Sequence, residues 1–595
     1  MAEIQSFSFD QHGFEEIKTH PLGRDWPIVY IIENGKEVYI GETTSAFNRS
    51  KEHFDNVRRL NLKKIHLVLD EEFNKSATLD LESQLIQYFA AEGKLKLQNG
   101  NKGLENHNFF DKGRYRAKLA TIWEQLQKRL VVTRSLEEIE NTELFKYSPY
   151  KALTEDQLSV ANKLHEAIKS GNAQTHIVNG GPGTGKTILA IYLVKLLQAD
   201  PGTRNLSVAL VIPMTSLRKS LKQVFSTVTG LSANMVIGPS EAAGKKFDLL
   251  IVDEAHRLRQ RRNITNYRVH DETNRKFGLG NEGTELDWVL RSSQQQILFY
   301  DENQSIRPAD VRAERVKELD AKHYHLLGQI RVKGGEKYIS FINDLFLGKE
   351  SLDGAFDNFD FQIYDDAQKL VEDIKKKDSE VGLSRLVAGF AWPWISRNNQ
   401  DVFDIEIGDV KLKWNHTTSG WVNSLNAVNE VGCIHTVQGY DLNYVGVIVG
   451  PELTYDAIND RLAIDKDKYE DRNGWQGIDD PAELERYIIN IYKTLMTRGM
   501  RGCYLYFVDK GTEKYFKSRL IANSNKKAAS IKSPYAEMVQ IPLVGTAPCG
   551  APLLGEQNIE EYILVEKPKS KSGFKDYILR AEGDSMDLAG IQDGD

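Results

Sequence analysis

The strongest constraint on this chain is a glycine-rich run, Gly180 to Thr187, with the pattern G-x-x-x-x-G-K-T. An apolar segment at 175–178 precedes it and predicts a buried strand, and the segment 188–197 that follows predicts a helix. Glycines let backbone N–H groups point at an anion, and the N-terminus of a helix favours negative charge. The run therefore predicts a loop that holds the phosphates of a nucleoside triphosphate. The alternative is a strand–helix turn that binds nothing.

The loop and a later acidic segment together predict a magnesium–nucleotide site. Lys186 is expected to reach the β- and γ-phosphates, and Thr187 to bind magnesium. An apolar run from Phe247 predicts a strand that ends in Asp253-Glu254. Asp253 is expected to bind the magnesium through water, and Glu254 to polarise the attacking water. The other nucleotide contacts expected on this side are Gly180, Gly183 and Gly185 in the loop, and Asp301, Gln304 and Arg307 after a third strand.

The composition is that of a globular protein, with 41% hydrophobic and 27% charged residues among 595. This length predicts roughly four domains of about 150 residues each. No apolar run of about 18 residues occurs, and the N-terminus lacks the basic start and apolar core of a secretory signal. We therefore expect no membrane span and a cytoplasmic location. Three widely spaced cysteines predict neither a disulfide framework nor a zinc site.

A set of later motifs resembles superfamily 1 helicase-like ATPases over residues 151–522, and the segments 388–394 and 435–441 resemble the Schlafen-related branch. Two cofactors, ATP and magnesium, follow from the resemblance. It also implies that Gln157 reads adenine, although Thr154 and Gln157 equally predict a helix-capping box. The remaining implied nucleotide-facing residues are Gln329, Arg331, Thr436, Gln438 and Gly439, with Arg498 and Arg501 as candidate arginine fingers. Such motifs do not by themselves predict strand unwinding.

The N-terminal region predicts a β-hairpin, because two β-rich runs at 27–32 and 36–42 flank Asn34-Gly35. A following helix carries Arg49 and His53 on one face, since they are four residues apart. A second helix places Glu82 beside an apolar stripe. Taken singly, Tyr30 and Tyr39 are as well explained by strand packing, and Glu82 by a solvated helix surface.

As an ordered set, these residues resemble the GIY-YIG nuclease family over roughly 90 residues. Val29-Tyr30 corresponds to the first signature, with Val in place of the usual Ile, and Tyr39-Ile40-Gly41 to the second. The resemblance implies phosphodiester cleavage with magnesium or manganese held by Glu82. It also implies water activation by Tyr39 with help from Tyr30, and charge stabilisation by Arg49. Other implied site residues are His53 and Asn99.

The C-terminal region, 535–595, resembles the LexA-like Ser–Lys peptidase family. Gly583-Asp-Ser-Met586 and Gly590-Ile-Gln-Asp-Gly-Asp595 carry the resemblance. It implies Cys549-Gly550 as the cleaved bond and Ser585 as the nucleophile. The family's activating lysine would follow Asp595, and a serine without a base is a weak nucleophile. We expect this domain to need a partner or a further segment, or to serve only in self-association.

Two local features bear on nucleic-acid binding, since the net charge of -7 does not predict it for the whole surface. The stretch from His256 to Lys276 holds seven Arg or Lys residues against two acids, which fits either a phosphate-binding surface or a solvated loop. Trp392 and Trp394 fit either base stacking or a core. Nucleic acid, DNA rather than RNA, is the expected partner, with a homo-oligomer as a further possibility.

The sequence thus predicts an α/β multidomain protein. The expected function is an ATP-dependent nuclease with a helicase-like motor, acting on DNA in defence against foreign DNA. The alternatives are an ATP-switched platform that binds nucleic acid without cutting, and a DNA-repair helicase–nuclease. The expected domains are a GIY-YIG domain at 1–115, a helical connector at 116–150, RecA-like parallel-sheet lobes at 151–310 and 311–522, a linker at 523–534, and an incomplete, mostly-β LexA-like segment at 535–595.

Overall fold

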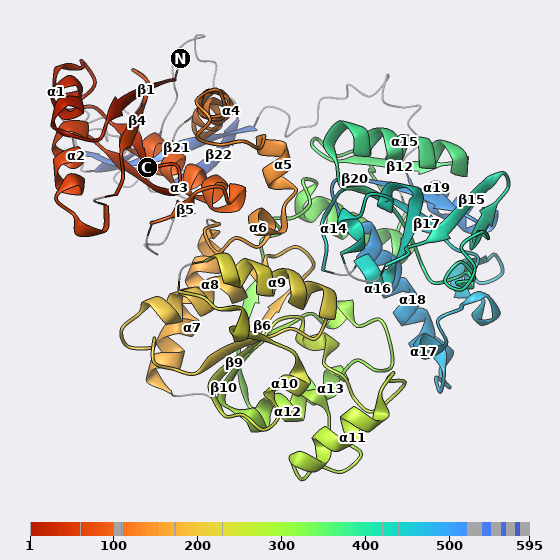
Figure 1. Ribbon diagram of the computed structural model, residues 1–595. Coiled ribbons are helices and arrows are strands. Elements are labelled where there is room, and N and C mark those ends of the chain that lie inside the picture. The colour runs from red at the N-terminus through yellow and green to blue at the C-terminus, as the bar shows by residue number, and fades with distance from the viewer. Residues whose placement is uncertain are drawn as a thin grey trace. The chain divides into compact units, whose positions relative to one another are not determined.

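The structure, a computed structural model, divides into two compact units, Met1–Leu520 and Ile521–Asp595 (Figure 1). In the first unit it describes residues 2–59, 61–99, 109, 111–151, 153–171, 174–228, 230–350, 352–417, 420–437 and 439–520. In the second unit it describes the backbone of three strands, 538–548, 561–566 and 578–582.

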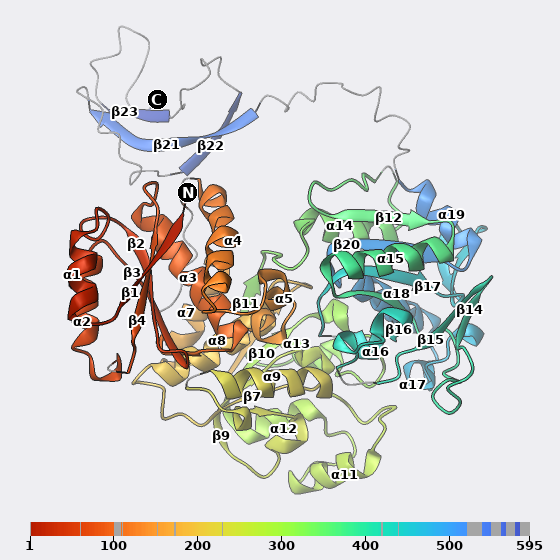
Figure 2. The same cartoon turned by 45° about the horizontal axis from the view of Figure 1, so that its top comes forward.

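The N-terminal part is a five-stranded sheet with helices on both faces (Figure 2). Its elements are β1 (Glu3–Ser8), α1 (Gln11–Thr19), β2 (Ile28–Glu33), β3 (Glu37–Thr43), α2 (Ala46–Phe54), η1 (Val57–Arg59), β4 (Lys64–Leu69), α3 (Lys75–Glu92) and β5 (Lys96–Leu97). The strand order is β1-β4-β2-β3-β5, and every neighbouring pair except β3 and β5 is antiparallel. The predicted hairpin is confirmed, with Gly35 at a φ of 79° in its turn.

Side chains of β2 alternate between two cores, as a pleated strand requires. Tyr30 and Ile32 pack in the cluster that contains Phe14 of α1. Val29 and Ile31 pack in the cluster that contains the buried side of α3. Consequently the first signature tyrosine lies on the face that α2, the helix of Arg49 and His53, also covers.

The connector joins this sheet to the next part through a continuous core. It comprises α4 (Lys112–Lys128), α5 (Leu136–Glu140) and α6 (Glu143–Lys146). Trp123 of α4 and Ile139 of α5 belong to the same buried cluster as Phe89 of α3 and Leu189 of the following lobe. Ser135 and Glu138 form a capping box that starts α5.

The first lobe is a six-stranded parallel sheet in the order β11-β6-β10-β9-β7-β8. One face packs against the cluster of α7, α8 and α9, and the other against α10, α12 and α13 (Figure 1). The strands are β6 (Thr175–Gly180), β7 (Val208–Val211), β8 (Val236–Ile237), β9 (Phe247–Val252), β10 (Ser293–Tyr300) and β11 (Ala321–Leu326). The helices are α7 (Glu155–Ser170), α8 (Lys186–Ala199), α9 (Thr215–Thr227), α10 (Pro239–Ala242), α11 (Tyr267–Lys276), α12 (Glu285–Ser292) and α13 (Ala313–Lys317), with η2 (Ala233–Met235), η3 (Ala255–Arg257) and η4 (Glu302–Gln304).

The first lobe extends beyond the boundary predicted at residue 310. Strand β11 pairs in parallel with β6, from Ala321 opposite Thr175 to Leu326 opposite Gly180. It therefore belongs to the sheet of the phosphate loop, and the division between the lobes follows Leu326. Strand β11 lies at the edge of the sheet, where Lys322 and His323 are exposed. Its sequence therefore lacks the continuous apolar run that is typical of a buried parallel strand.

The second lobe is a seven-stranded sheet in the order β12-β20-β17-β13-β16-β15-β14, parallel except for β14 and β15. Helix α15 packs in the cluster on one face, and α14, α18 and α19 in the cluster on the other. The strands are β12 (Asp360–Tyr364), β13 (Ser384–Ala388), β14 (Ile405–Ile407), β15 (Val410–Trp414), β16 (Glu430–Cys433), β17 (Leu442–Val449) and β20 (Gly499–Phe507), with the hairpin β18 (Leu453–Asp456) and β19 (Arg461–Ile464) beside them. The helices are α14 (Gly335–Phe346), α15 (Ala367–Val381), α16 (Ile434–Val437), α17 (Arg472–Trp475), α18 (Pro481–Met496) and α19 (Lys510–Ser518), with η5 (Trp421–Asn423), η6 (Ala427–Asn429) and η7 (Lys466–Lys468).

The second unit contains a three-stranded sheet in the order β22-β21-β23. Strand β21 (Met538–Pro548) is antiparallel to β22 (Glu561–Glu566) and parallel to β23 (Ile578–Glu582). This agrees with the expected mostly-β segment. Ser585 and the Cys549-Gly550 bond lie outside the described residues.

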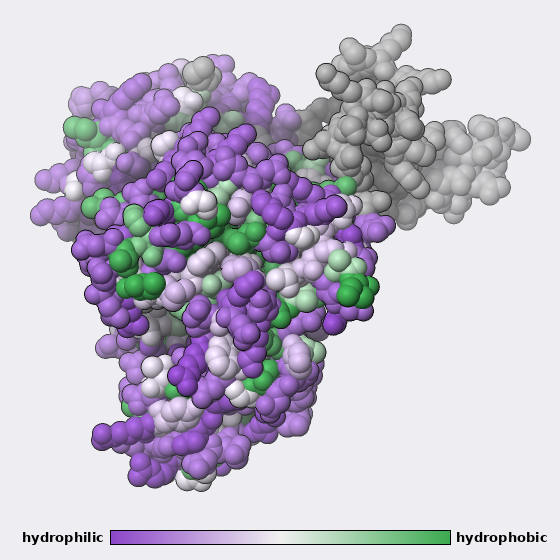
Figure 3. Space-filling model, turned by 90° about the vertical axis from the view of Figure 1, so that its right-hand side faces the viewer, coloured by the Kyte–Doolittle hydropathy of each residue, from purple (hydrophilic) through white to green (hydrophobic). Residues whose placement is uncertain are grey.

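The surface in Figure 3 is largely hydrophilic, with hydrophobic side chains in small separate groups. Among the residues that the structure describes, no helix combines the length and the apolar character needed to cross a bilayer.

Candidate nucleotide site and candidate nuclease site

The phosphate loop connects β6 to α8, as the sequence predicts. Gly183 and Gly185 both have a φ of 79°, a conformation that glycine adopts readily and other residues rarely. Helix α8 begins at Lys186, so Lys186 and Thr187 lie at the N-terminus of a helix of 14 residues. Backbone N–H groups and the helix dipole therefore favour an anion at this point.

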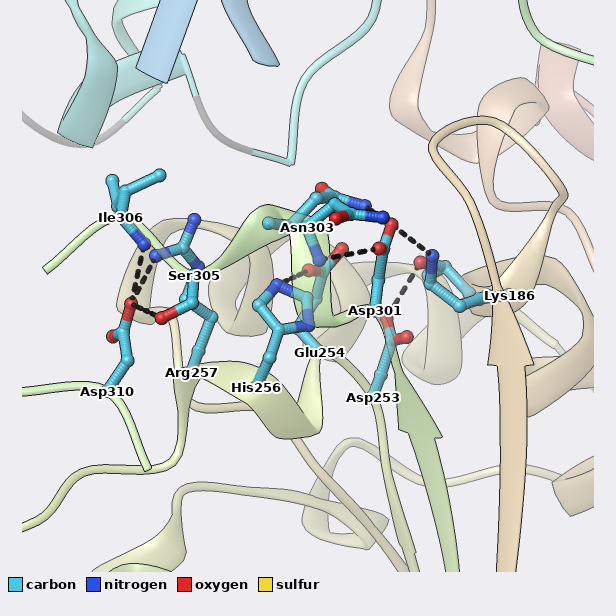
Figure 4. Close-up of polar contacts among 12 residues, drawn as sticks. Lys186, Asp253, Glu254, His256, Arg257, Asp301, Asn303, Ser305, Ile306 and Asp310 are labelled. Atoms are coloured by element: carbon cyan, nitrogen blue, oxygen red, sulfur yellow. Dashed lines mark hydrogen bonds and ion pairs between the residues drawn. The ribbon is translucent and has the colours of Figure 1, made fainter. Parts of the chain in front are cut away.

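Lys186 is 6% exposed, and loop oxygens hold its ammonium group. Its Nζ donates to the carbonyls of Gly180 at 2.6 Å and Gly181 at 3.0 Å, and lies 3.5 Å from Asp301 Oδ2 (Figure 4). Gln304 donates to the same Asp301 oxygen at 2.5 Å. The two residues expected to sense the γ-phosphate thus contact each other, and Asp301 also contacts the lysine of the loop.

The residues expected to hold magnesium also lie together. Thr187 Oγ1 donates to Asp253 Oδ2 at 2.7 Å. Asp253 is fully buried, and its other oxygen, Oδ1, has no hydrogen-bond partner among the described residues. Burial and the neighbouring charge of Glu254 raise the pKa of Asp253 to about 7. A buried carboxylate with a vacant oxygen beside a threonine hydroxyl fits Mg²⁺, which takes oxygen ligands and offsets such a charge.

Glu254 follows Asp253 with a φ of 53°, which turns its side chain toward His256. Glu254 Oε2 lies 2.8 Å from His256 Nε2, and His256 is fully buried (Figure 4). Burial acts to raise the pKa of Glu254, but His256, Lys186 and Arg498 outweigh it and hold that pKa well below its usual range. Glu254 therefore stays ionised beside the loop, as a residue that polarises water must.

The two lobes share a cavity of about 390 Å³ over the phosphate loop. This volume lies within the range typical of small-molecule sites. The first lobe contributes Lys186, Thr187, Glu254 and Gln304 to its lining. The second lobe contributes Ile330, Arg331, Lys333, Gly439, Asp441, Met500 and Arg501.

The segment with Gln329 and Arg331 contacts the phosphate loop directly. Ile330 N donates to the Gly183 carbonyl at 2.9 Å, and a Cβ on Gly183 would lie 2.9 Å from the Cβ of Arg331. Arg331 Nε lies 2.7 Å from Asp441 Oδ1. This segment therefore lies against the phosphate loop, and the absence of a side chain at Gly183 leaves room for Arg331.

The two candidate arginine fingers have different surroundings. Arg501 lines the cavity, and its Nη2 lies 3.8 Å from Glu140 Oε2 of the connector. Arg498 is 3% exposed, and its Nε has no partner among the described residues. Burial, together with the charge of Arg331, lowers the pKa of Arg498 to about 10. Both arginines lie near the interface between the lobes, but only Arg501 of this pair is among the residues that line the cavity.

Gln157 serves as both helix cap and loop contact in this structure. Its Oε1 accepts from Thr154 N at 3.0 Å, and its Nε2 donates to the Thr184 carbonyl at 2.8 Å. The predicted capping box is therefore confirmed. Adenine recognition by Gln157 stays a prediction. Thr436 contacts Cys433 Sγ at 3.2 Å, and Gln438 lies outside the described residues.

The connector and the residue that follows it contribute residues to this cavity that sequence reasoning missed: Glu140, Asn141, Phe145, Lys146, Tyr147 and Lys151. Lys146 Nζ donates to the Asp441 carbonyl at 2.7 Å, and Tyr147 OH to the Gly439 carbonyl. Burial lowers the pKa of Lys151 to about 8. No local pattern marks Lys146 and Tyr147, because their partners Asp441 and Gly439 lie 295 and 292 positions away in the chain.

The basic stretch 256–276 forms pairs within the protein. Arg257 donates to Asp310 at 2.8 Å with both side chains buried (Figure 4). Arg307, expected beside the γ-phosphate sensors, also contacts Asp310, at 3.2 Å. Three further arginines pair with acids: Arg261 with Asp271, Arg262 with Glu483, and Arg268 with Glu272. The interpretation as a phosphate-binding surface loses support, because most of its cations already have carboxylate partners.

Trp392 and Trp394 are half-buried and pack against the core cluster of the second lobe. The Trp392 carbonyl accepts from Trp414 Nε1 at 3.2 Å. The structure therefore favours the core interpretation for these two residues over base stacking.

Four of the residues expected in the N-terminal site lie together between β2, β3 and α2. Tyr30 OH donates to His53 Nε2 at 2.5 Å, and Arg49 Nε donates to Tyr30 OH at 3.4 Å. The ring centroids of Tyr39 and His53 are 4.9 Å apart. Burial raises the pKa of Tyr30. The hydrogen bond that Arg49 makes with Tyr30 raises the pKa of Arg49. Tyr30 fits this place because Gly41, opposite it, has no side chain.

Arg59 joins this cluster and was missed. Its guanidinium lies 3.7 Å from the centroid of the Tyr39 ring, and Nη1 is 3.3 Å from His53 Nε2. An arginine can only donate, so His53 Nε2 acts as an acceptor for both Arg59 and Tyr30. The sequence signal for Arg59 is weak: it is only the Arg58-Arg59 pair just after the helix that carries His53.

Glu82 lies on α3, half-buried, with burial and the charge of Glu42 raising its pKa to about 7. Glu42 is paired with Lys75 Nζ at 2.5 Å. No group of three or more His, Cys, Asp or Glu side chains in the described ranges forms a metal-binding cluster. One carboxylate still fits Mg²⁺, which keeps several waters and takes further oxygens from a phosphate. Asn99 instead pairs with the backbone of Ile40 through both amide atoms, at 2.6 and 3.0 Å.

Two parallel-sheet lobes, a phosphate loop in one and cavity-lining arginines in the other define a helicase-like P-loop ATPase. The family described as Schlafen group 3, DNA/RNA helicase domain, matches residues 173–509, which is more than half of the chain. The chain belongs to this family. A second family, described as Peptidase S24-like, matches residues 542–595.

Curated relatives match both regions. An uncharacterized protein of Saccharomyces cerevisiae is 28% identical over 383 residues, 56% of this chain and 81% of that protein. The LexA repressor of Clostridium kluyveri is 33% identical over 89 residues, 15% of this chain and 44% of the repressor. That of Leptospira biflexa is 54% identical over 56 residues, 9% of this chain and 27% of the repressor. The chain thus spans less than half the length of these repressors.

Two solved structures show low overall similarity to this chain. The Pif1 helicase from Bacteroides in complex with ADP-AlF3 and ssDNA has a TM-score of 0.25 and 13% identity, covering 62% of this chain and 95% of that one. Mss116p bound to ssRNA and AMP-PNP has a TM-score of 0.31 and 13% identity, covering 66% and 76%.

Proposed function

We propose that this protein is an ATP-hydrolysing, nucleic-acid-dependent motor whose N-terminal part is a GIY-YIG-like, metal-dependent nuclease. DNA is the proposed substrate in preference to RNA. Defence against foreign DNA is the proposed biological role, by analogy with other proteins that combine such domains. The observation that carries the motor is the shared cavity, where Lys186, Thr187 and Glu254 face Arg331 and Arg501.

Each part of this cavity has a role in the proposed hydrolysis. Lys186 leaves the Gly180 and Gly181 carbonyls for the triphosphate, which offers it more negative charge. Asp253 and Thr187 would hold Mg²⁺, whose charge would neutralise that developing on the phosphates. Glu254 orients the attacking water, and Arg501 adds positive charge when the lobes close. Hydrolysis thereby depends on the distance between the lobes.

The nuclease part of the proposal rests on the Tyr30, Tyr39, Arg49 and His53 cluster. Tyr30 OH donates a hydrogen bond to His53 Nε2, and the Tyr39 ring lies against the His53 ring. In this proposal these groups take the proton that the attacking water loses. Arg49 would stabilise the phosphate, and Glu82 would hold the metal that polarises it.

The C-terminal part supports a further proposal, a LexA-like self-cleavage or sensing module. The match to S24-like peptidases over residues 542–595 is its support. In this proposal Ser585 attacks the Cys549-Gly550 bond once a base activates it. Incubation of the full chain at mildly alkaline pH, followed by intact-mass analysis, tests it. Two fragments divided at Cys549-Gly550, absent in Ser585→Ala, are expected; an intact chain contradicts it.

The motor is tested by ATP hydrolysis with and without single-stranded DNA, duplex DNA and RNA. Hydrolysis that rises about tenfold or more with one of them supports the motor and identifies its track. Lys186→Ala is expected to abolish hydrolysis. Turnover by that variant, or hydrolysis indifferent to every nucleic acid, contradicts the proposal; the second result instead favours an ATP-switched platform.

A further inference from the structure

Helix α3 links the candidate nuclease site to the nucleotide cavity. It carries Glu82 and, six residues later, Tyr88, so these side chains are about 9 Å apart along the axis at about 1.5 Å per residue. Tyr88 is buried, and its hydroxyl donates to Glu140 Oε1 at 2.6 Å. Glu140 is the last residue of α5 and lines the nucleotide cavity. One carboxylate therefore contacts both the nuclease helix and the ATPase cavity.

The second oxygen of the same carboxylate faces the candidate arginine finger. Glu140 Oε2 lies 3.8 Å from Arg501 Nη2. At this distance the pair is loose, and a triphosphate in the cavity offers Arg501 more charge and a better geometry. Glu140 thus has one firm partner, Tyr88, and one partner that a bound nucleotide can remove.

The packing around this contact is tight enough to transmit a shift of Glu140. The Tyr88 ring lies 4.7 Å, centroid to centroid, from Phe145, which also lines the cavity. At the end of α3, Glu92 accepts from Thr133 N at 2.9 Å and from Thr133 Oγ1 at 2.6 Å. Helix α3 is therefore held by the connector at two points on its C-terminal half, and a movement of the connector reaches it as a whole.

We propose that Glu140 is a positioning residue that couples nucleotide binding to the nuclease site, an inference that rests on the proposed function of both sites. In this structure Arg501 lies beside Glu140, with Nη2 3.8 Å from Oε2. When Arg501 turns to the triphosphate, Glu140 keeps only the Tyr88 hydroxyl, and the Tyr88–Glu140 bond tightens. Helix α3 then shifts and changes the position of Glu82 relative to Tyr39 and Arg49.

Two substitutions in the full chain separate the two sides of this contact. Tyr88→Phe removes the hydroxyl and keeps the ring packing and the Arg501 pair. Glu140→Gln keeps an acceptor for Tyr88 and removes the charge that attracts Arg501. Glu138→Gln is the matched control, because it makes the same change on the same helix and glutamine preserves the capping box with Ser135.

The primary readout is backbone hydrogen exchange of α3 with and without a non-hydrolysable ATP analogue, which does not require cleavage. In the wild type and in Glu138→Gln, exchange within α3 is expected to change by about fivefold or more on nucleotide binding. In Tyr88→Phe and Glu140→Gln this change should be lost. In Glu140→Gln the KM for ATP should also fall, because Arg501 is released, whereas Tyr88→Phe should leave ATP hydrolysis within about twofold of wild type.

The outcomes distinguish this inference from the proposed function. A wild-type α3 whose exchange ignores the nucleotide overturns the coupling, even if the protein cuts DNA. Equal nucleotide responses in Tyr88→Phe, Glu140→Gln and the control overturn the role of Glu140. A nucleotide response that depends on Glu140 in a protein that cuts nothing supports the coupling and rejects the nuclease. Where cleavage is seen, its stimulation by ATP should fall about fivefold or more in both variants.

Discussion

At the scale of single residues, the contact between Thr187 and Asp253 is the part of the nucleotide site that the structure defines most closely. A hydroxyl and a buried carboxylate 2.7 Å apart leave one carboxylate oxygen without a partner in the part of the chain that the structure describes. The ammonium group of Lys186 is held by the loop carbonyls and Asp301, so it does not pair with Asp253. We therefore expect the carboxylate of Asp253 to bind a magnesium ion.

A substitution at Thr187 tests this point. Thr187→Ala should lower the kcat for ATP hydrolysis by about 100-fold or more, because the magnesium loses an oxygen ligand at the reacting phosphates. Thr187→Ser keeps the hydroxyl and should retain most of the activity. Steady-state hydrolysis over a magnesium titration measures both. Equal activity in the two variants would show that the hydroxyl is not a ligand.

Gly41 offers a test of the N-terminal cluster. A Cβ at this position would lie 2.2 Å from Tyr30 OH, so Gly41→Ala should displace the Tyr30 hydroxyl from His53 and remove cleavage. The expected cost in stability is about 1–3 kcal/mol, typical of overpacking. Gly113→Ala on α4 is the control, because nothing lies within 4 Å of its added Cβ. Gly41→Ala with unchanged cleavage and melting temperature would contradict the arrangement of the site.

At the scale of secondary-structure elements, β17 and α18 are joined by a buried acid. Glu452, just beyond β17, is fully buried, and Tyr492 OH of α18 donates to its Oε1 at 2.5 Å. Its Oε2 has no partner among the described residues. Burial raises the pKa of Glu452 to about 7. The neutral acid therefore suits the folded second lobe, and the ionised acid does not.

This raised pKa predicts how stability varies with pH. The folded state binds a proton that the unfolded state releases near its ordinary pKa, so the stabilisation is complete below that value and is lost as pH rises through about 7. A shift of this size corresponds to about 3 kcal/mol over the whole window. Melting temperatures of wild type and Glu452→Gln between pH 5 and 8.5 measure it. The wild type should lose stability relative to the variant as pH rises; a constant difference would refute the prediction.

The elements that the sequence predicts well are those with strong local signals. The loop from Gly180 to Thr187, the strand before Asp253 and the hairpin around Gly35 all follow from glycine positions and buried apolar runs. Strand β11 was placed in the wrong lobe, because edge strands carry polar residues and pairing partners lie far away. The pairing of Arg257 with Asp310, and of Lys146 with Asp441, also depends on tertiary contacts that no local pattern reveals.

At the scale of the whole molecule, the described residues of the first unit connect the N-terminal sheet, the connector and the two lobes through direct contacts. The buried cluster that begins in the N-terminal sheet continues through Trp123 and Ile139 into the first lobe. Lys146 and Tyr147 of the connector bond the loop of the second lobe at Gly439 and Asp441. The connector, which the sequence presents as a spacer, therefore touches every part that the proposed ATP cycle would move.

The measurement that tests the central claim most directly is cleavage of plasmid, linear duplex and single-stranded DNA, and of RNA. Each is incubated with magnesium or manganese, with and without ATP, using wild type, Glu82→Ala and Lys186→Ala. We predict cleavage of DNA that ATP stimulates, that Glu82→Ala abolishes without loss of ATP hydrolysis, and that Lys186→Ala no longer couples to ATP. No cleavage of any substrate, with ATP still hydrolysed, would contradict a motor-coupled nuclease.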